Sequence, residues 1–194
     1  MNLKSIITVM ALILIMFMAA IETSIISLAL PTIKNSLNAG NLVSLVFTVY
    51  FIALVIANPI VGELMSRFKI INIAVVGVSL FALGSLMSGL SQTFTFLIIS
   101  RIVQGFGAGV MMSLSQIVPK LAFEIPLRYK IMGIVGSVWG ISSIIGPLLG
   151  GAILEFASWH WLFYINIPIA ILAIILVFMT FHFPDETQVQ QSRF

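Results

Sequence analysis

The sequence predicts an all-α membrane protein, a bundle of six transmembrane helices. Of its 194 residues, 60% are hydrophobic and only 8% are charged, whereas about a quarter of the residues of a soluble domain are charged. Six apolar runs approach the roughly 20 residues that a helix needs to cross a bilayer. The runs are continuous, whereas a membrane β-barrel would alternate apolar and polar residues in stretches of about ten.

The predicted spans follow one another with short connections. The first has only Lys4 ahead of it and no small-residue cleavage site, which favours a retained span over a removed signal peptide. The fifth is rich in glycine, and the sixth is followed by a polar segment. We therefore expect a bundle over 1–183 and a cytoplasmic tail or start of a linker over 184–194. The six spans lie near residues 5–30, 42–64, 71–90, 94–117, 130–154 and 161–183.

The basic residues predict the orientation in the membrane. With the N-terminus in the cytoplasm, seven basic residues fall inside and one, Lys34, falls outside, as the positive-inside rule requires. The net charge of +3 is then a topology signal and no indication of nucleic-acid binding. We expect a multi-pass protein of the plasma membrane with both termini of this chain in the cytoplasm. The seven are Lys4, Arg67, Lys69, Lys120, Arg128, Lys130 and Arg193.

The sequence suggests no enzyme. Cysteine is absent, which excludes disulfides and thiolate chemistry. Neither histidine has a plausible catalytic or metal-binding partner nearby in sequence, and no phosphate-binding glycine loop precedes a helix. We expect no cofactor.

Two charges are predicted to lie level with each other inside the membrane. Glu22 lies nine residues before Pro31 at the outer end of the first span, and Arg101 lies about seven residues into the fourth, roughly 10 Å down at 1.5 Å per residue. A charge at this depth costs about 3 kcal/mol on insertion scales, so such residues usually pair or line a watery cavity. One interpretation is proton exchange by Glu22, tuned by movement of Arg101. The other is a static ion pair that fixes helix register.

The fifth span carries a face of small residues. They are spaced by three and four, which places them on one side of a helix. Small residues allow close helix packing in lipid, and Gly146-Pro147 removes one backbone hydrogen bond, so a seam that rocks or bends is also possible. These residues are Gly133, Gly136, Gly140, Ser143, Pro147 and Gly150.

An internal repeat is indicated by shared spacings. Pro31 and Pro119 are 88 residues apart, as are Pro59 and Pro147, and "PIVG" recurs as "PLLG" at the same offset. This period spans three helices, the size of the inverted repeat from which large transporter folds are built.

Four motifs in order resemble those of the fourteen-spanner drug:proton antiporters of the major facilitator superfamily. "IETSIISLALP" is similar to the family's first-helix signature, and "LIISRIVQGFGAGVMM" to its fourth-helix motif. "GISSIIGPLLGGAIL" resembles the antiporter motif of the fifth helix, and "WHWLFYINIPIAIL" the start of the sixth. The resemblance implies the N-terminal six-helix half of a major facilitator, a 3+3 inverted repeat.

The resemblance also implies roles for particular positions. Glu22 takes the place of an aspartate that handles protons and substrate, and Arg101 that of an arginine linked to proton coupling. The energy source would be the proton gradient. The further motif positions are Gln104 and Gly105 in the fourth span and Gly140, Gly146, Pro147, Gly150 and Gly151 in the fifth.

The loop after the second span departs from the family pattern. In "GELMSRFKII" the residues Gly62, Leu64 and Arg67 match, but Ser66 replaces an aspartate and Lys69 a glycine. This loop latches one conformational state in the family, so the latch looks degraded here. His160 replaces an arginine, and we assign it no mechanism.

The expected function is proton-coupled multidrug efflux, with this chain as the N-terminal half. The alternatives are a non-transporting truncated or partner half-transporter, or an exporter of a metabolite or tetracycline-like compound. The expected partners are the bilayer, protons, lipophilic and cationic small molecules, and a missing C-terminal bundle or second copy. Five aromatic or methionine side chains could form an apolar wall that binds such cations. The alternative, which is the more common one for such residues, is that they pack inside the bundle or face lipid. They are Met16, Met18, Tyr50, Phe51 and Trp139.

Overall fold

The computed structural model describes residues 3–181 and consists there of six helical spans long enough to cross a membrane. The predicted fold class and number of spans are confirmed. Arg193 and the expected tail over 184–194 lie outside the described residues. The elements are α1 (Leu3–Ser36), the 3₁₀ helix η1 (Gly40–Ser44), α2 (Leu45–Met65), α3 (Ile70–Leu90), α4 (Phe94–Ala122), α5 (Leu127–Phe156), α6 (Trp161–Tyr164) and α7 (Asn166–Thr180).

Prolines affect the helix boundaries less than the sequence suggested. The expected ends at residues 30 and 117 were wrong, because α1 continues through Pro31 and α4 through Pro119. A proline near a helix end removes one backbone bond, and the remaining turns still form. The sixth span is interrupted at Ile165. Its Pro168 has no N–H for the carbonyl of Tyr164, which explains the break between α6 and α7.

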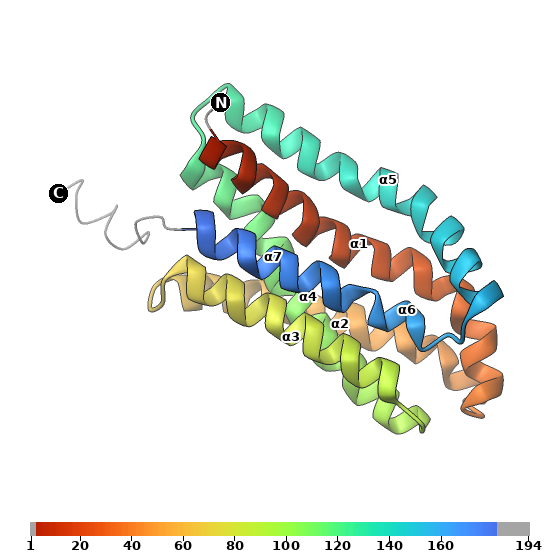
Figure 1. Ribbon diagram of the computed structural model, residues 1–194. Helices are drawn as coiled ribbons and strands as arrows, with labels where there is room; N and C mark the ends of the chain where they lie inside the picture. Colours follow the sequence, from red (N-terminus) through yellow and green to blue (C-terminus); the bar gives the residue numbers. More distant parts are fainter. Residues whose placement is uncertain (1–2, 182–194) are drawn as a thin grey trace.

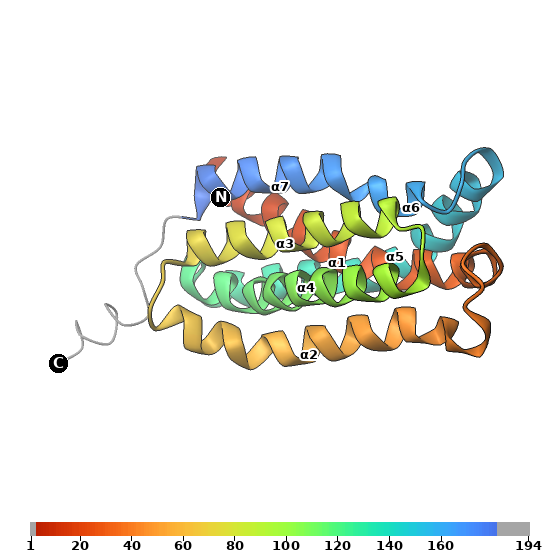
Figure 2. The same ribbon diagram turned by 90° about the horizontal axis from the view of Figure 1, so that it is seen from below.

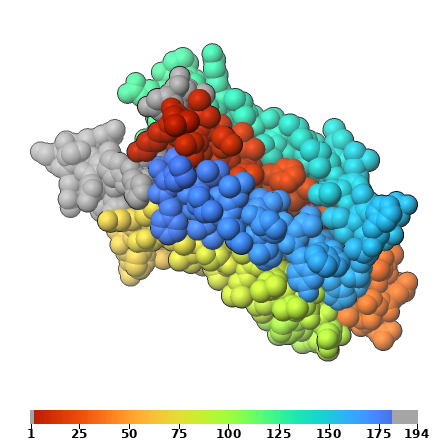
Figure 3. Space-filling view, in the orientation of Figure 1, coloured from red at the N-terminus to blue at the C-terminus, as the bar shows by residue number. Residues whose placement is uncertain are grey.

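Helices α1 and α4 form the centre of the bundle. α1 packs between α5 and α7, and α4 packs between α2 and α3 (Figures 1 and 2). In the most apolar 18-residue segment of each helix, 61% of the residues of α1 and 56% of those of α4 are buried. The corresponding share is 28% in each of the spans that contain α2 and α5. Helix α7 lies between α1 and α3 on one face (Figure 3). Residues on α1 and α4 are therefore the ones that meet inside the bundle.

The packing follows the repeat indicated by the sequence. Asn58 of α2 accepts a 2.7 Å hydrogen bond from Ser113 of α4. The positions 88 residues away are Gly146 of α5 and Ile25 of α1, and these also meet, since a Cβ built on Gly146 would lie 3.3 Å from the Ile25 nitrogen. In each three-helix unit, therefore, the middle helix packs against the first helix of the other unit: α2 against α4, and α5 against α1.

Close helix contacts rely on glycines of α4. A Cβ on Gly105 would overlap the backbone carbonyl of Tyr50 in α2, and one on Gly107 would overlap the Phe81 nitrogen in α3. In a bilayer, an apolar side chain gains little free energy by moving from lipid into a helix contact. Close approach of the backbones is therefore a main source of helix association.

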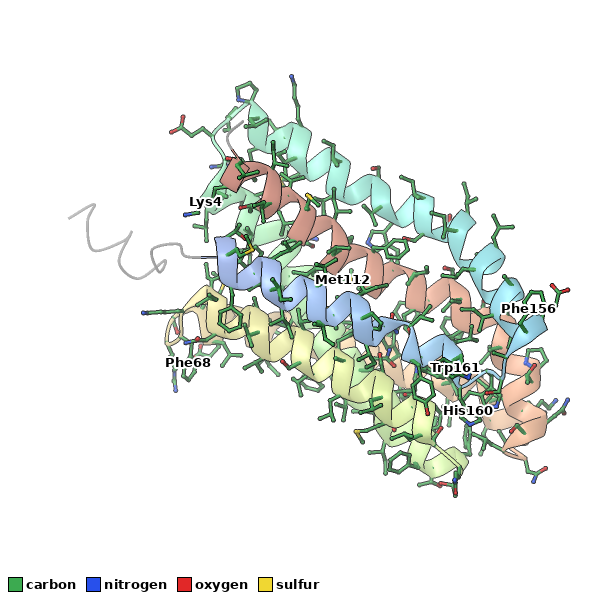
Figure 4. The ribbon with its side chains drawn as sticks, in the orientation of Figure 1. Lys4, Phe68, Met112, Phe156, His160 and Trp161 are labelled. Atoms are coloured by element: carbon green, nitrogen blue, oxygen red, sulfur yellow. The ribbon has the colours of Figure 1, made fainter. Side chains whose placement is uncertain are left out.

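The two ends of the bundle differ in charge. Lys4 and Phe68 mark one end, and Phe156, His160 and Trp161 mark the other (Figure 4). Because the helices alternate in direction, the basic loops that the sequence assigned to one side do gather at the Lys4 end, while Lys34 closes α1 at the opposite end. Which end faces the cytoplasm stays a prediction.

Candidate functional site: a buried ion pair in the bundle centre

Glu22 of α1 and Arg101 of α4 form an ion pair inside the bundle. Arg101 Nη1 donates to Glu22 Oε1 at 2.6 Å, and both side chains have no exposed surface. The level placement expected from the sequence is thus present as a direct contact. It is the charge-assisted kind of hydrogen bond, shorter and stronger than a neutral one.

Arg101 is fixed from three further directions. Its Nε donates to the carbonyl of Val46 in α2 at 3.0 Å, and its Nη1 also donates to Gln104 Oε1 at 3.0 Å. The guanidinium carbon lies 4.3 Å from the ring centroid of Tyr50, a favourable cation–π distance. Tyr50 in turn donates to the carbonyl of Ala19 at 3.3 Å. The guanidinium therefore connects α1, α2 and α4.

The second carboxylate oxygen of Glu22 is held by the sixth span. Asn166 Nδ2 donates to Glu22 Oε2 at 2.8 Å and to Ser85 Oγ of α3 at 3.2 Å. Gln104 Nε2 donates to the same Ser85 oxygen at 2.8 Å. Five of the six spans thus contribute to a single polar network around the carboxylate.

The network is not fully paired. Arg101 Nη2 and Asn166 Oδ1 are buried and have no hydrogen-bond partner among the residues that the structure describes. One cationic donor and one amide acceptor are thus unused beside Glu22. Buried polar groups usually find partners, so these two atoms leave room for a rearrangement of the hydrogen bonds around Glu22.

The predicted motif residues of α5 divide into two groups. Gly146 and Gly150 are buried against Ser24 and Ile25 of α1. Ser24 also donates to the carbonyl of Ser142 at 3.1 Å, which ties α1 to α5 next to Glu22. The remaining predicted positions are exposed, and a Cβ on any of the glycines among them would meet nothing within 4 Å: Gly133, Gly136, Gly140, Ser143, Pro147 and Gly151. The tight seam expected along the whole face is present only around Gly146 and Gly150.

The residues of the loop motif lie away from the ion pair. Arg67 bonds to Glu63 at 3.2 Å on the surface, where both side chains are 69% exposed. Gly62 faces open space, and Leu64 lines a groove on the bundle surface. The structure therefore brings Glu22, Arg101, Gln104 and Gly105 together but not the loop.

Most of the side chains proposed to bind a cation are packed inside the bundle. Met16, Met18 and Tyr50 are buried in the core, and Trp139 packs against it. Only Phe51 is exposed, at 41%. Packing is thus the main role of these side chains, which is the alternative that the sequence favoured.

Sequence reasoning assigned no role to Asn166 and Ser85. The signal was available for Asn166, a carboxamide in an otherwise apolar span between Trp161 and Thr180. Ser85 gave no such signal, because serine is common at helix contacts in membranes.

Comparison with known proteins places this architecture in a family. The profile of the Major Facilitator Superfamily matches residues 12–194. The chain belongs to the major facilitator superfamily. The superfamily expected from the four motifs is confirmed.

The sequence relatives of this chain include drug exporters. It is 80% identical to the multidrug efflux pump SdrM of Staphylococcus aureus strain N315, over 100% of this chain and 43% of that protein. It is 33% identical to the multidrug transporter MdtP of Bacillus subtilis strain 168, over 90% of this chain and 32% of that protein. The chain thus spans less than half the length of these curated relatives.

Solved major facilitators share the fold. The chain superposes on a D-xylose–proton symporter with a TM-score of 0.80 at 16% identity, covering 98% of this chain and 52% of that one. It superposes on the inward-open xylose transporter XylE of E. coli with a TM-score of 0.77, covering 96% and 50%. The six spans correspond to about half of a complete superfamily member.

Proposed function

We propose that this chain is the N-terminal half of a proton-coupled multidrug exporter, which moves lipophilic cations outward in exchange for protons. The observation that carries the proposal is the fully buried Glu22, paired with Arg101 on one oxygen and held by Asn166 on the other. Identity of 80% with a multidrug efflux pump supports export of several drugs. The proton gradient supplies the energy, and no resident cofactor or enzymatic reaction is proposed.

The proton acts on the ion pair. When Glu22 is ionised, its charge and that of Arg101 neutralise each other inside the bundle. When Glu22 takes a proton, the guanidinium loses its counter-ion and becomes an unpaired charge, which costs about 3 kcal/mol on insertion scales. Movement of α1 relative to α4 that gives Arg101 a new partner then becomes favourable. Protonation is thereby coupled to a change of helix packing.

A cationic drug would act on the same carboxylate. It competes with Arg101 for an ionised Glu22 and has no such attraction to a protonated one, so drug and proton exclude each other. This exclusion is the requirement for antiport, and it rests on one carboxylate serving both ligands.

We place the protein in the plasma membrane with the Lys4 end of the bundle in the cytoplasm. The support is the distribution of basic residues described above, which favours retention of the basic loops inside. The described residues contain an even number of spans, which puts both ends of the described bundle on one side, the cytoplasm in this proposed orientation.

The test is drug efflux from cells that express the whole protein with Glu22→Gln. This variant keeps the size of the side chain and one acceptor oxygen, but it has no charge and cannot exchange a proton, so uncoupler-sensitive export should fall to background. The matched control is Glu63→Gln, because Glu63 is an exposed carboxylate that also pairs with an arginine. Undiminished export by the Glu22 variant would exclude the proposed role.

Expression of the 194-residue chain beside the whole protein separates the remaining alternatives. Export by the whole protein alone agrees with a half-transporter that needs its other bundle. Export by the short chain would mean that two copies assemble into a transporter.

A further inference from the structure

A groove runs along the bundle surface between α2 and α3, with α4 as its floor. Its volume is about 300 Å³. It lies apart from the polar network around Glu22, which none of its lining residues joins. The lining residues are Ala57, Ile60 and Leu64 of α2, Phe68 of the loop, Asn72, Ile73, Val76 and Leu80 of α3, and Phe106 and Val110 of α4.

The groove offers an apolar surface to the membrane. Every lining residue except Asn72 is apolar. Ile60, Phe68 and Val76 are 40%, 51% and 57% exposed. In a helix bundle within a bilayer, a surface of this kind is in contact with lipid acyl chains.

The length of the groove matches one leaflet. Along α3 it extends from Asn72 to Leu80, eight residues or about 12 Å at 1.5 Å per residue. The hydrocarbon core of a bilayer is about 30 Å thick, so one leaflet contributes about 15 Å. The groove therefore accommodates one acyl chain that enters from the Lys4 end of the bundle.

The mouth of the groove is basic. Phe68, which lines the groove, is flanked in sequence by Arg67 and Lys69. Glu63 takes one hydrogen bond from Arg67, but the arginine side chain is still 69% exposed, and a guanidinium has five N–H donors. Two basic residues thus flank the loop residue that lines the groove, against the single acidic residue Glu63.

The loop lacks an acidic residue that the family motif has near the mouth of the groove. Ser66 occupies the position where the family motif has an aspartate, and its hydroxyl donates to the Glu63 carbonyl at 2.7 Å. A carboxylate there would oppose an anionic headgroup. The departure that weakens the expected latch therefore makes the mouth more basic.

We propose that the groove binds an anionic phospholipid, with one acyl chain between α2 and α3 and the phosphate at Arg67 and Lys69. This site is separate from the drug and proton site, and it holds whether or not the chain exports drugs. Basic residues at the membrane surface attract anionic lipid by electrostatics that act within a Debye length, and the groove adds the specificity of a fitted chain.

The test is lipid binding to the whole purified protein in detergent, followed by native mass spectrometry. Phosphatidylglycerol is compared with phosphatidylcholine of the same acyl chains. We expect tighter binding of phosphatidylglycerol, and a loss of about fivefold for each basic side chain removed, or about 25-fold in the Arg67→Gln/Lys69→Gln variant. The matched control is Lys4→Gln/Lys130→Gln, which removes two exposed charges from the same end of the bundle.

The acyl site is tested separately with Val76→Trp, which fills the groove. Its control is Ile175→Trp, since Ile175 is a similarly exposed residue on α7. We expect only the Val76 variant to lose phosphatidylglycerol. Equal binding of the two lipids, equal losses in the two charge variants, or unchanged binding by Val76→Trp would each overturn the proposal.

Discussion

Replacing Asn166 by alanine should destabilise the bundle by about 2 kcal/mol. The side chain donates to Glu22 at 2.8 Å and to Ser85 at 3.2 Å inside the protein. A hydrogen bond to a charged group contributes about 1.5–3 kcal/mol, and a neutral bond between membrane helices about 0.6 kcal/mol. The larger part of the loss comes from Glu22, whose second oxygen is left buried without a donor.

The measurement is equilibrium unfolding of the purified protein in mixed detergent micelles. The matched control is Asn58→Ala, which also removes an interhelical hydrogen bond, to Ser113, but at an exposed position. We expect a loss below about 1 kcal/mol for the control. In a Glu22→Gln background the cost of Asn166→Ala should also fall below about 1 kcal/mol, because its acceptor is no longer charged. An Asn166 variant as stable as the control, or an unchanged cost in that background, would refute the assignment of the bond to the carboxylate.

Three further perturbations test other parts of the structure. Arg101→Lys should abolish export in a transport assay, because a single ammonium cannot reproduce the separate Nε and Nη1 bonds. Gly105→Leu should destabilise the 194-residue chain by more than about 2 kcal/mol in a thermal unfolding assay, since its Cβ would overlap a carbonyl, whereas Gly136→Leu meets open space and should cost little. In this cysteine-free chain, a membrane-impermeant thiol reagent should label Lys34→Cys in intact cells and Lys69→Cys only after permeabilisation; the reverse pattern would invert the proposed topology.

Much of the fold could be predicted from the sequence because the relevant signals are local. The length of the apolar runs predicted the six spans, and the positions of the basic residues predicted which connections lie at the same end of the bundle. The repeat was also visible, in prolines and glycines 88 residues apart. The helix ends near Pro31 and Pro119 were placed too early, since a proline close to the end of a long helix is tolerated.

The candidate site was predicted only in part. Glu22 and Arg101 stood out because charges inside an apolar span are rare and expensive. Their hydrogen-bonding partners could not be ranked in the same way, since Asn166 and Ser85 are uncharged and the Val46 carbonyl has no side-chain signal at all. The roles of Glu22 and Arg101 stay predictions that the efflux assay will test.

The sequence by itself predicted six membrane-spanning helices in this chain, with one carboxylate and one guanidinium at a similar depth. Only the tertiary structure decided which helices surround that pair. Lipid tails are as apolar as leucine, so hydropathy does not specify which face of a helix meets which neighbour. That choice depends on backbone approach at glycines such as Gly105 and on polar bonds between distant residues such as Glu22 and Asn166, and these arise only when all six spans are packed together.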